Sequence, residues 1–157
     1  VISVAMSKNQ ALLNIADVGT GSGAIAIAIA LNVPFARVMA VDISQAALEV
    51  ADSNRRRHGV RDRIHLCRGN LLEPISGAMD IIVSNPPYLR KESIKFLQNE
   101  VRREPRIALD GGLDGLDVIR ELLRQSTSKL KSSNCKHFKS LLLIIKPKGA
   151  VGVYSVL

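Results

Sequence analysis

The chain of 157 residues is 46% hydrophobic, so it can bury the core of one globular domain and is not disordered by composition. Its formal net charge is +8, but residues 1–121 hold 15 Lys and Arg against 14 acids, whereas residues 122–157 hold seven cations and no acid. The two cysteines lack the spacing of a disulfide or metal scaffold, and no apolar run approaches the length of a membrane span.

Apolar runs that predict strands alternate with runs that predict helices through the first half of the chain. The predicted strands are 12–18, 37–41, 63–68 and 79–84, and the predicted helices are 24–31 and 45–58. The Ala and Ile residues of 24–31 predict a fully buried helix, while Ser44 and Gly59 are a typical N-cap and stop for the next one. This alternation predicts an α/β fold, a doubly wound and mostly parallel sheet with helices on both faces.

The second half of the chain is less regular. The predictions are a loop at 69–78, a helix at 116–125, a polar surface loop at 126–140, a strand or helix at 141–145, a turn at 146–149 and the fifth strand at 150–157. We therefore expect a single domain over 1–157. Its motif-bearing core is 12–125, and 126–157 is a basic C-terminal segment.

A glycine-rich loop, Gly19-Thr20-Gly21-Ser22-Gly23, joins the first predicted strand to the first predicted helix. Glycines at this place let the backbone turn sharply and approach a ligand, toward which the N–H groups of the helix point. Asp42 ends the next strand, 19 residues after Gly23, where a carboxylate can accept from both hydroxyls of a ribose. The loop and the acid together indicate either a dinucleotide or S-adenosylmethionine.

The tetrapeptide Asn85-Pro86-Pro87-Tyr88 follows the fourth predicted strand, at a strand end where open α/β sheets bind ligands. The two prolines fix the backbone and remove two N–H donors. Asn85 offers a donor and an acceptor to a planar nitrogen group, and Tyr88 offers a flat face for stacking. The tetrapeptide therefore favours a methyltransferase acting on a planar nitrogen over a dehydrogenase, and a simple proline turn stays open as the alternative.

With these motifs the chain resembles the class I S-adenosylmethionine-dependent methyltransferases, and within them the HemK/PrmC-type protein-glutamine methyltransferases, which modify the Gly-Gly-Gln motif of peptide chain release factors. The resemblance covers residues 14–125 and rests on the segments 17–26, 41–42, 83–88 and 100–116. The stretch from Glu104 to Leu116 separates this family from the adenine methyltransferases, which share Asn-Pro-Pro-Tyr. The resemblance implies a Rossmann-like methyltransferase core.

The resemblance also implies roles for particular residues. The glycine loop would hold the methionine moiety of S-adenosylmethionine, Asp42 its ribose, and Asn70 with Leu71 its adenine. The residues that would grip the substrate glutamine amide are Asn85, Pro86, Pro87 and Tyr88, with no base or metal required. The full set of expected cofactor residues is Asp17, Gly19, Thr20, Gly21, Ser22, Gly23, Asp42, Ile43, Asn70, Leu71 and Asn85.

Two features depart from the family. Only residues 1–11 precede the first predicted strand, where the family has a helical substrate-docking domain, and the hairpin that ends the family's sheet is not recognisable. We therefore expect a truncated core. Because no secretion signal is recognisable, we also expect the protein to lie inside the cell, in the cytoplasm, a mitochondrion or a plastid.

The expected partner is a release factor; nucleic acid bound through the basic tail is less favoured, and no membrane partner is expected. A nucleic-acid adenine methyltransferase and a non-catalytic remnant that binds cofactor or a partner stay open as alternatives.

Overall fold

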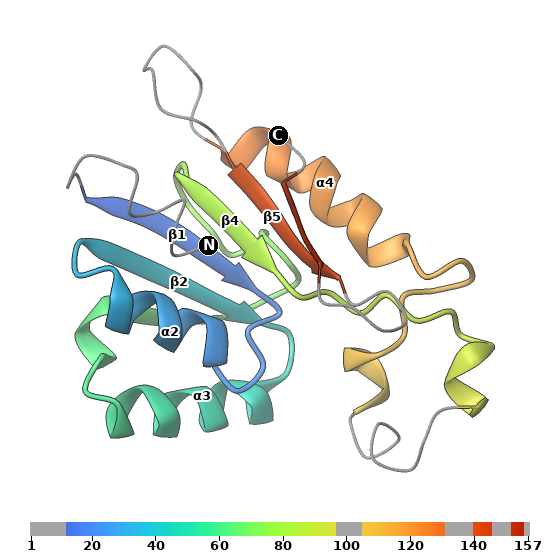
Figure 1. Ribbon diagram of the computed structural model, residues 1–157, viewed down its shortest axis with the longest axis horizontal. Helices are drawn as coiled ribbons and strands as arrows, with labels where there is room; N and C mark the ends of the chain where they lie inside the picture. The colour runs from blue at the N-terminus through green and yellow to red at the C-terminus, as the bar shows by residue number, and fades with distance from the viewer. Residues whose placement is uncertain (1–11, 97–104, 131–139, 146–151, 156–157) are drawn as a thin grey trace.

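The computed structural model describes residues 12–96, 105–130, 140–145 and 152–155, and its strands form one sheet in the order β3-β2-β1-β4-β5-β6 (Figure 1). The strands are β1 Leu13–Val18, β2 Ala36–Asp42, β3 Ile64–Arg68, β4 Ile81–Ser84, β5 Ser140–Ile145 and β6 Gly152–Ser155. Strands β1 to β5 run parallel to one another, and β6 pairs antiparallel with β5. The predicted α/β fold with a mostly parallel sheet is confirmed.

Helices cover both faces of the sheet, as expected for a doubly wound fold (Figure 1). The helices are α2 Ala24–Asn32, α3 Gln45–Arg57 and α4 Asp117–Lys129, with short 3-10 turns η1 Arg61–Arg63, η2 Ser93–Phe96 and η4 Arg106–Ala108. Helices α2 and α3 share one face, and α4 lies on the other. The predicted cap is confirmed, because the Ser44 hydroxyl accepts from Ala47 N at 3.3 Å, and Gly59 follows α3 with φ of 66°.

The alternation of side chains along β1 divides the core into two clusters. Leu13 and Ile15 pack with Ile29 of α2 in the first cluster. Ala16 and Val18 belong to the second, which includes Ile119 and Leu122 of α4 and loop residues between β3 and β4. Because both faces of β1 are buried, the strand is held firmly, and so is the loop that follows it.

Two helix predictions need correction. Helix α2 is not fully buried: Leu31 is 51% exposed, because one side of the helix packs on the sheet and the other faces away from it. Helix α4 does not end at Gln125 but continues to Lys129, and Ser126, predicted in a surface loop, is wholly buried. The hydroxyls of Ser126, Thr127 and Ser128 each donate to a helix carbonyl three residues earlier. These polar side chains therefore have hydrogen-bond partners within the helix.

The structure tests two of the elements predicted near the C-terminus. Residues 141–145 lie in a strand, β5, which adds to the sheet beside β4. The strand predicted at 150–157 is β6, which makes it the sixth strand of the sheet and not the fifth. Residues 131–139 and the predicted turn at 146–149 lie outside the described residues.

Candidate active site

A cleft lies at the carboxyl ends of β1, β2 and β4. Its volume is about 450 Å³, and five segments line it: 19–22, 41–50, 69–71, 85–87 and 105–118. Strands β2 and β4 flank β1 on opposite sides, so the chain connections diverge at this point of the sheet. Open α/β sheets bind ligands at such a position, and the volume suits a small molecule.

The glycine loop forms one wall of the cleft. Gly19, Gly21 and Gly23 have φ values of 70°, 56° and 82°, which other residues rarely adopt. A Cβ at Gly19 or Gly21 would meet no atom within 4 Å, but one at Gly23 would lie 3.2 Å from the Cβ of Ala51 in α3. The first two glycines therefore leave open space at the cleft, and the third allows α2 and α3 to pack closely.

Asp42 at the end of β2 ties two walls of the cleft together. Its Oδ2 accepts from Gly21 N at 2.8 Å, and its Oδ1 accepts from Ser44 N at 2.9 Å. The side chain is only partly buried, and each carboxylate oxygen has a further lone pair. Asp42 can therefore hold the glycine loop in place and still accept hydrogen bonds from a ligand.

Asp17 lies beneath the glycine loop and is completely buried. Its Oδ2 accepts from the Thr20 hydroxyl at 2.7 Å and from Ala26 N at 3.0 Å. Among the described residues, its Oδ1 is the buried side-chain atom left without a hydrogen-bond partner. Burial raises the pKa of Asp17 to about 6, against the lowering effect of the two hydrogen bonds. Asp17 thus holds the loop to the start of α2 and does not reach the cleft.

The loop after β3 supplies Asn70 and Leu71 to the cleft. Leu71 has φ of 51°, the left-handed region that a leucine enters only under strain. The next residue, Leu72, is fully buried, and its N–H donates to Gln125 Oε1 of α4 at 2.8 Å. A buried side chain of α4 therefore fixes the strained turn.

The tetrapeptide after β4 places two of its residues in the cleft, Asn85 and Pro87. Pro86 is buried, and Tyr88 is half-buried against the core cluster on the α4 side, away from the cleft lining. The turn starts from a fixed point, because the buried Ser84 hydroxyl donates to Val18 O at 2.8 Å. This bond joins the tetrapeptide to the strand that carries the glycine loop.

A second glycine-rich segment, 109–116, packs onto the backbone of the tetrapeptide. Leu89 N donates to Leu109 O at 3.0 Å, and Gly111 N donates to Leu89 O at 2.8 Å. A Cβ at Gly115 would lie 2.5 Å from Tyr88 O, and one at Gly111 would lie 2.9 Å from Tyr88 Cα. Glycine is therefore required at both positions for the two segments to approach each other.

The structure brings most of the predicted site residues to the cleft. Those that line it are Gly19, Gly21, Ser22, Asp42, Ile43, Asn70, Leu71, Asn85 and Pro87. Those that do not line it are Asp17, Thr20, Gly23, Pro86 and Tyr88. Sequence reasoning missed the remaining lining residues, Val41, Ser44, Ala47, Val50, Gly69, Pro105, Ile107, Ala108 and Val118. The close spacing of the glycines at 111, 112 and 115 was the signal that a second loop folds over this site.

The residues that the structure describes lack the features of two other kinds of site. They contain no group of three or more His, Cys, Asp or Glu side chains that could hold a metal ion. The same part of the chain has no helix that is both long and apolar enough to cross a membrane.

Known proteins resemble this chain in sequence and in structure. It is 44% identical over 132 residues to the release factor glutamine methyltransferase of Gloeobacter violaceus, and 50% identical over 118 residues to that of Moorella thermoacetica. It is 46% identical over 121 residues to the ribosomal protein uL3 glutamine methyltransferase of Bradyrhizobium diazoefficiens. These alignments cover 83%, 74% and 76% of this chain but 46%, 42% and 38% of the relatives, so the chain spans less than half their length.

The fold itself is that of known methyltransferases. The crystal structure of ribosomal protein L11 methylase from Lactobacillus delbrueckii superposes with a TM-score of 0.61 at 24% identity, over 91% of this chain and 56% of that one. At this identity the likeness concerns the fold alone. The methyltransferase small domain family matches residues 3–112, which include the glycine loop, Asp42 and the tetrapeptide. The chain therefore belongs to the methyltransferase small domain family.

Proposed function

We propose that this chain binds S-adenosylmethionine and transfers its methyl group to the side-chain amide nitrogen of a glutamine in a protein. The observation that carries this proposal is that the glycine loop, Asp42 and Asn85 line one cleft. A cofactor-binding wall and a group able to hold an amide thus lie at the same opening. Residues 12–125 supply all of these groups, and the basic segment 126–157 supplies none of them.

The residues present fit the cofactor. The open space beside Gly19 and Gly21 is a cradle that any Cβ would begin to fill, and it suits the methionine moiety. The partly exposed carboxylate of Asp42 suits the two ribose hydroxyls. Apolar side chains from Ile43, Val50 and Leu71 line the same cleft and suit the flat adenine ring. When bound, the cofactor supplies an electrophilic methyl group on a sulfonium sulfur.

The tetrapeptide would hold the substrate. A carboxamide nitrogen is a weak nucleophile because its lone pair is delocalised, so position and exclusion of water matter more than a strong base. Asn85 can accept from one amide hydrogen and donate to the amide oxygen. Pro86 is buried and does not line the cleft, and its backbone carbonyl is the proposed acceptor for the other hydrogen. The second glycine-rich segment keeps this turn rigid by its hydrogen bonds to Leu89.

The proposed reaction exchanges one bond for another. A nitrogen–carbon bond forms, the sulfur–carbon bond of the methyl donor breaks, and the amide nitrogen releases one proton to solvent. The residues of this chain hold the nitrogen and its hydrogens in the cleft. Tyr88 lies against the core in this structure, so its stacking on the amide plane requires the ring to turn toward the cleft.

The proposed substrate is the Gly-Gly-Gln motif of a peptide chain release factor. The sequence likeness to proteins named release factor glutamine methyltransferases supports it. A glutamine of ribosomal protein uL3 is the second candidate, which the relatives named for that substrate support at 46% identity. Transfer of labelled methyl groups to matched peptides of the two proteins distinguishes these substrates, and an adenine-containing DNA oligonucleotide serves as the third arm.

Calorimetry tests the cofactor separately from the substrate. We expect S-adenosylmethionine to bind and NAD to bind far more weakly. Tighter binding of NAD would contradict the proposal. Label on DNA alone would replace the protein substrate with a nucleic-acid base. Cofactor binding without transfer to any of the three substrates would indicate a non-catalytic cofactor-binding protein.

A further inference from the structure

We propose that the sheet edge formed by β3 is a second binding surface, which takes the phosphate backbone of RNA. The arginine surface is defined by six residues that line two hollows beside this edge: Arg37, Arg55, Arg56, Arg61, Arg63 and Arg68. They come from β2, α3, η1 and β3. None of these residues lines the methyltransferase cleft, and nothing in the proposed methyl transfer uses them.

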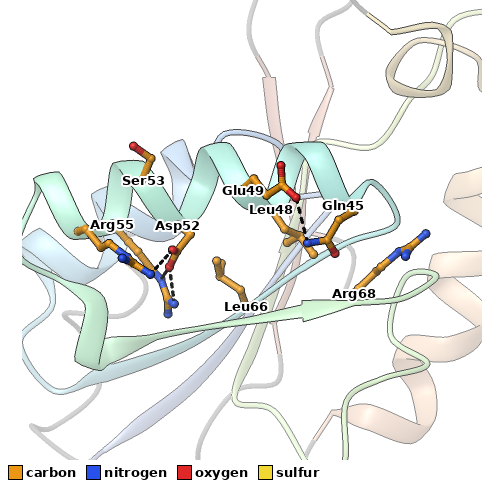
Figure 2. A pocket seen from close by; sticks show the side chains of 9 residues that line it. Gln45, Leu48, Glu49, Asp52, Ser53, Arg55, Leu66 and Arg68 are labelled. Carbon is orange, nitrogen blue, oxygen red and sulfur yellow. Dashed lines mark hydrogen bonds and ion pairs between the residues drawn. The ribbon is translucent and has the colours of Figure 1, made fainter.

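The two hollows lie on either side of the edge strand. The first, about 650 Å³, lies between α3 and β3, with Leu48 and Leu66 among its lining residues. The second, about 800 Å³, is lined by the start of β3, its neighbour β2 and residues 76–79. Arg55 lines both hollows. In Figure 2, Arg55 and Asp52 lie at one end of the first hollow, and Arg68 extends from β3 at the other end.

Four of the six arginines on this surface form no ion pair with another described residue. Asp52 pairs with both Arg55 and Arg56, each at 2.6 Å. In the part of the chain that the structure describes, no ion pair engages Arg37, Arg61, Arg63 or Arg68. Glu49 and Asp62 also line the hollows, so six arginines against three acids leave a net charge of +3, which attracts a polyanion.

The arginine surface is continuous with the rim of the cleft. Arg68 ends β3, and its Nε donates to the carbonyl of Ile43 at 3.3 Å. Ile43 lines the cleft, and so do Gly69, Asn70 and Leu71, which follow Arg68 directly. A chain bound along β3 would therefore reach the opening where the proposed methyl transfer occurs.

Two features favour RNA over an acidic protein as the occupant. Every cation between residues 12 and 90 is an arginine, with no lysine, and the guanidinium group both pairs bidentately with phosphate and stacks on unpaired bases. The five residues of β3 span about 16 Å at ~3.3 Å each, the rise of about five nucleotides at ~3.4 Å. The choice of RNA rests on the proposed function, because both proposed substrates act within or belong to the ribosome.

Salt-dependent binding of a labelled 12-nucleotide single-stranded oligouridine tests the proposal, with neither cofactor nor peptide present. The test variant is Arg37→Gln/Arg61→Gln, which removes two exposed and unpaired arginines at the far end from the cleft. The matched control is Arg120→Gln/Arg124→Gln on α4, where both arginines already pair with acids. The two variants lose the same charge from different elements, β2 and η1 in the test variant and α4 in the control.

We expect the test variant to bind about 25-fold more weakly at 0.1 M salt, with a salt slope smaller by about 1.4, since each phosphate contact on a single strand contributes about 0.7. The control should retain the wild-type slope. Equal loss in both variants, or absence of RNA binding, would overturn the proposal, and equal binding of polyglutamate would assign the surface to an acidic protein. Because no methyl donor is present, these outcomes are independent of whether the proposed methyl transfer is correct.

Discussion

Gln125 of α4 and Leu72 of the loop after β3 form a buried hydrogen bond, 2.8 Å from Leu72 N to Gln125 Oε1. Gln125 is itself oriented by a 2.7 Å bond from its Nε2 to Glu121 Oε1. The residue before Leu72 is Leu71, whose left-handed backbone lines the cleft. A helix on one face of the sheet thus maintains a strained turn at the proposed adenine position.

The first prediction concerns this anchor. Gln125→Leu should destabilise the protein by about 1–3 kcal/mol, because Leu72 N stays buried without a partner. The variant should also bind S-adenosylmethionine several-fold more weakly, because Leu71 can relax to an unstrained backbone. Chemical denaturation and calorimetry on one preparation measure both effects.

Two further variants distinguish an effect of Gln125 on the backbone of Leu71 from an effect on the stability of the protein alone. Thr127→Ala on the exposed side of α4 removes only a hydroxyl bonded to its own helix and should leave cofactor affinity unchanged. Asparagine tolerates a left-handed backbone, so Leu71→Asn should restore part of the affinity for S-adenosylmethionine when it is combined with Gln125→Leu. If the double variant binds no better than Gln125→Leu alone, the strained turn is not what Gln125 maintains.

Asp42 should contribute to cofactor affinity in two ways. Asp42→Ala removes the acceptor of Gly21 N and Ser44 N and also the proposed acceptor for the ribose hydroxyls. We expect a loss of about 1–3 kcal/mol in binding free energy, measured by calorimetry with S-adenosylmethionine. Asp42→Asn keeps one acceptor oxygen and should lose less. Equal affinity of the alanine variant and the wild type would exclude Asp42 from the cofactor site.

Asp17 should make folding stability depend on pH. Burial raises the pKa of Asp17 from its ordinary value of 3.8 to about 6, so the folded chain holds the proton more tightly than the unfolded chain. The stabilisation is complete below pH 3.8 and is lost as pH rises through 6, by about 3 kcal/mol in total at ~1.36 kcal/mol for each pKa unit.

Denaturant unfolding of the wild type and Asp17→Asn between pH 4 and 8 measures this dependence. The stability of the wild type relative to the variant should fall over that range, since asparagine does not titrate. Asp114→Asn is the control, because the hydrogen bond from Arg120 lowers the pKa of Asp114 from 3.8, so its contribution is lost mainly below that pH and should stay nearly constant over this range. A flat difference profile for Asp17→Asn would show that the buried carboxylate is already ionised at pH 4.

The ends of α3 and the strands of the sheet could be predicted from local signals in the sequence. Ser44 and Gly59 delimit α3 because capping is local chemistry, and the sheet follows from alternating apolar runs. The end of α4 was not predictable, because serines and threonines in isolation favour a loop. Their hydroxyls bond to carbonyls three residues earlier, which come within reach only once the helix has formed.

The site could be predicted where its residues adjoin strand ends. The glycine loop and Asn85 directly follow a strand and Asp42 ends one, and the parallel sheet gathers them at one edge. The contributions of Gln125 and Gly115 could not be predicted, because each acts on a segment distant in sequence, and sequence spacing does not indicate such contacts. Nor could the sequence indicate that Tyr88 packs toward the α4-side core.

Gly115 should be required for the tetrapeptide to hold its position. Gly115→Ala places a Cβ 2.5 Å from Tyr88 O in a backbone with φ of 83°. The matched control is Gly77→Ala, which also has a positive φ, 99°, but whose Cβ would meet no atom within 4 Å. Both variants should lose stability from the backbone strain, about 1 kcal/mol or more. Only Gly115→Ala should also lose methyl transfer per folded molecule, and equal turnover in the two variants would contradict this role of the close contact.

Asn85 is the residue on which the proposed chemistry depends most directly. If it holds the substrate amide, Asn85→Ala should lower the rate of methyl transfer by about a hundredfold or more, since an unpaired amide in a dry site costs about 3 kcal/mol in the transition state. Cofactor affinity should change little, because the glycine loop and Asp42 remain.

Asn85→Asp tests the role of the donor, because a carboxylate accepts hydrogen bonds but cannot donate to the amide oxygen. It should be nearly as inactive as Asn85→Ala while retaining a similar side-chain volume. If Asn85 only stabilises the turn into the two prolines, both variants would melt at a lower temperature and keep their turnover per folded molecule. Melting temperature and methyl transfer measured on the same purified samples distinguish these roles, and unchanged turnover would refute the catalytic one.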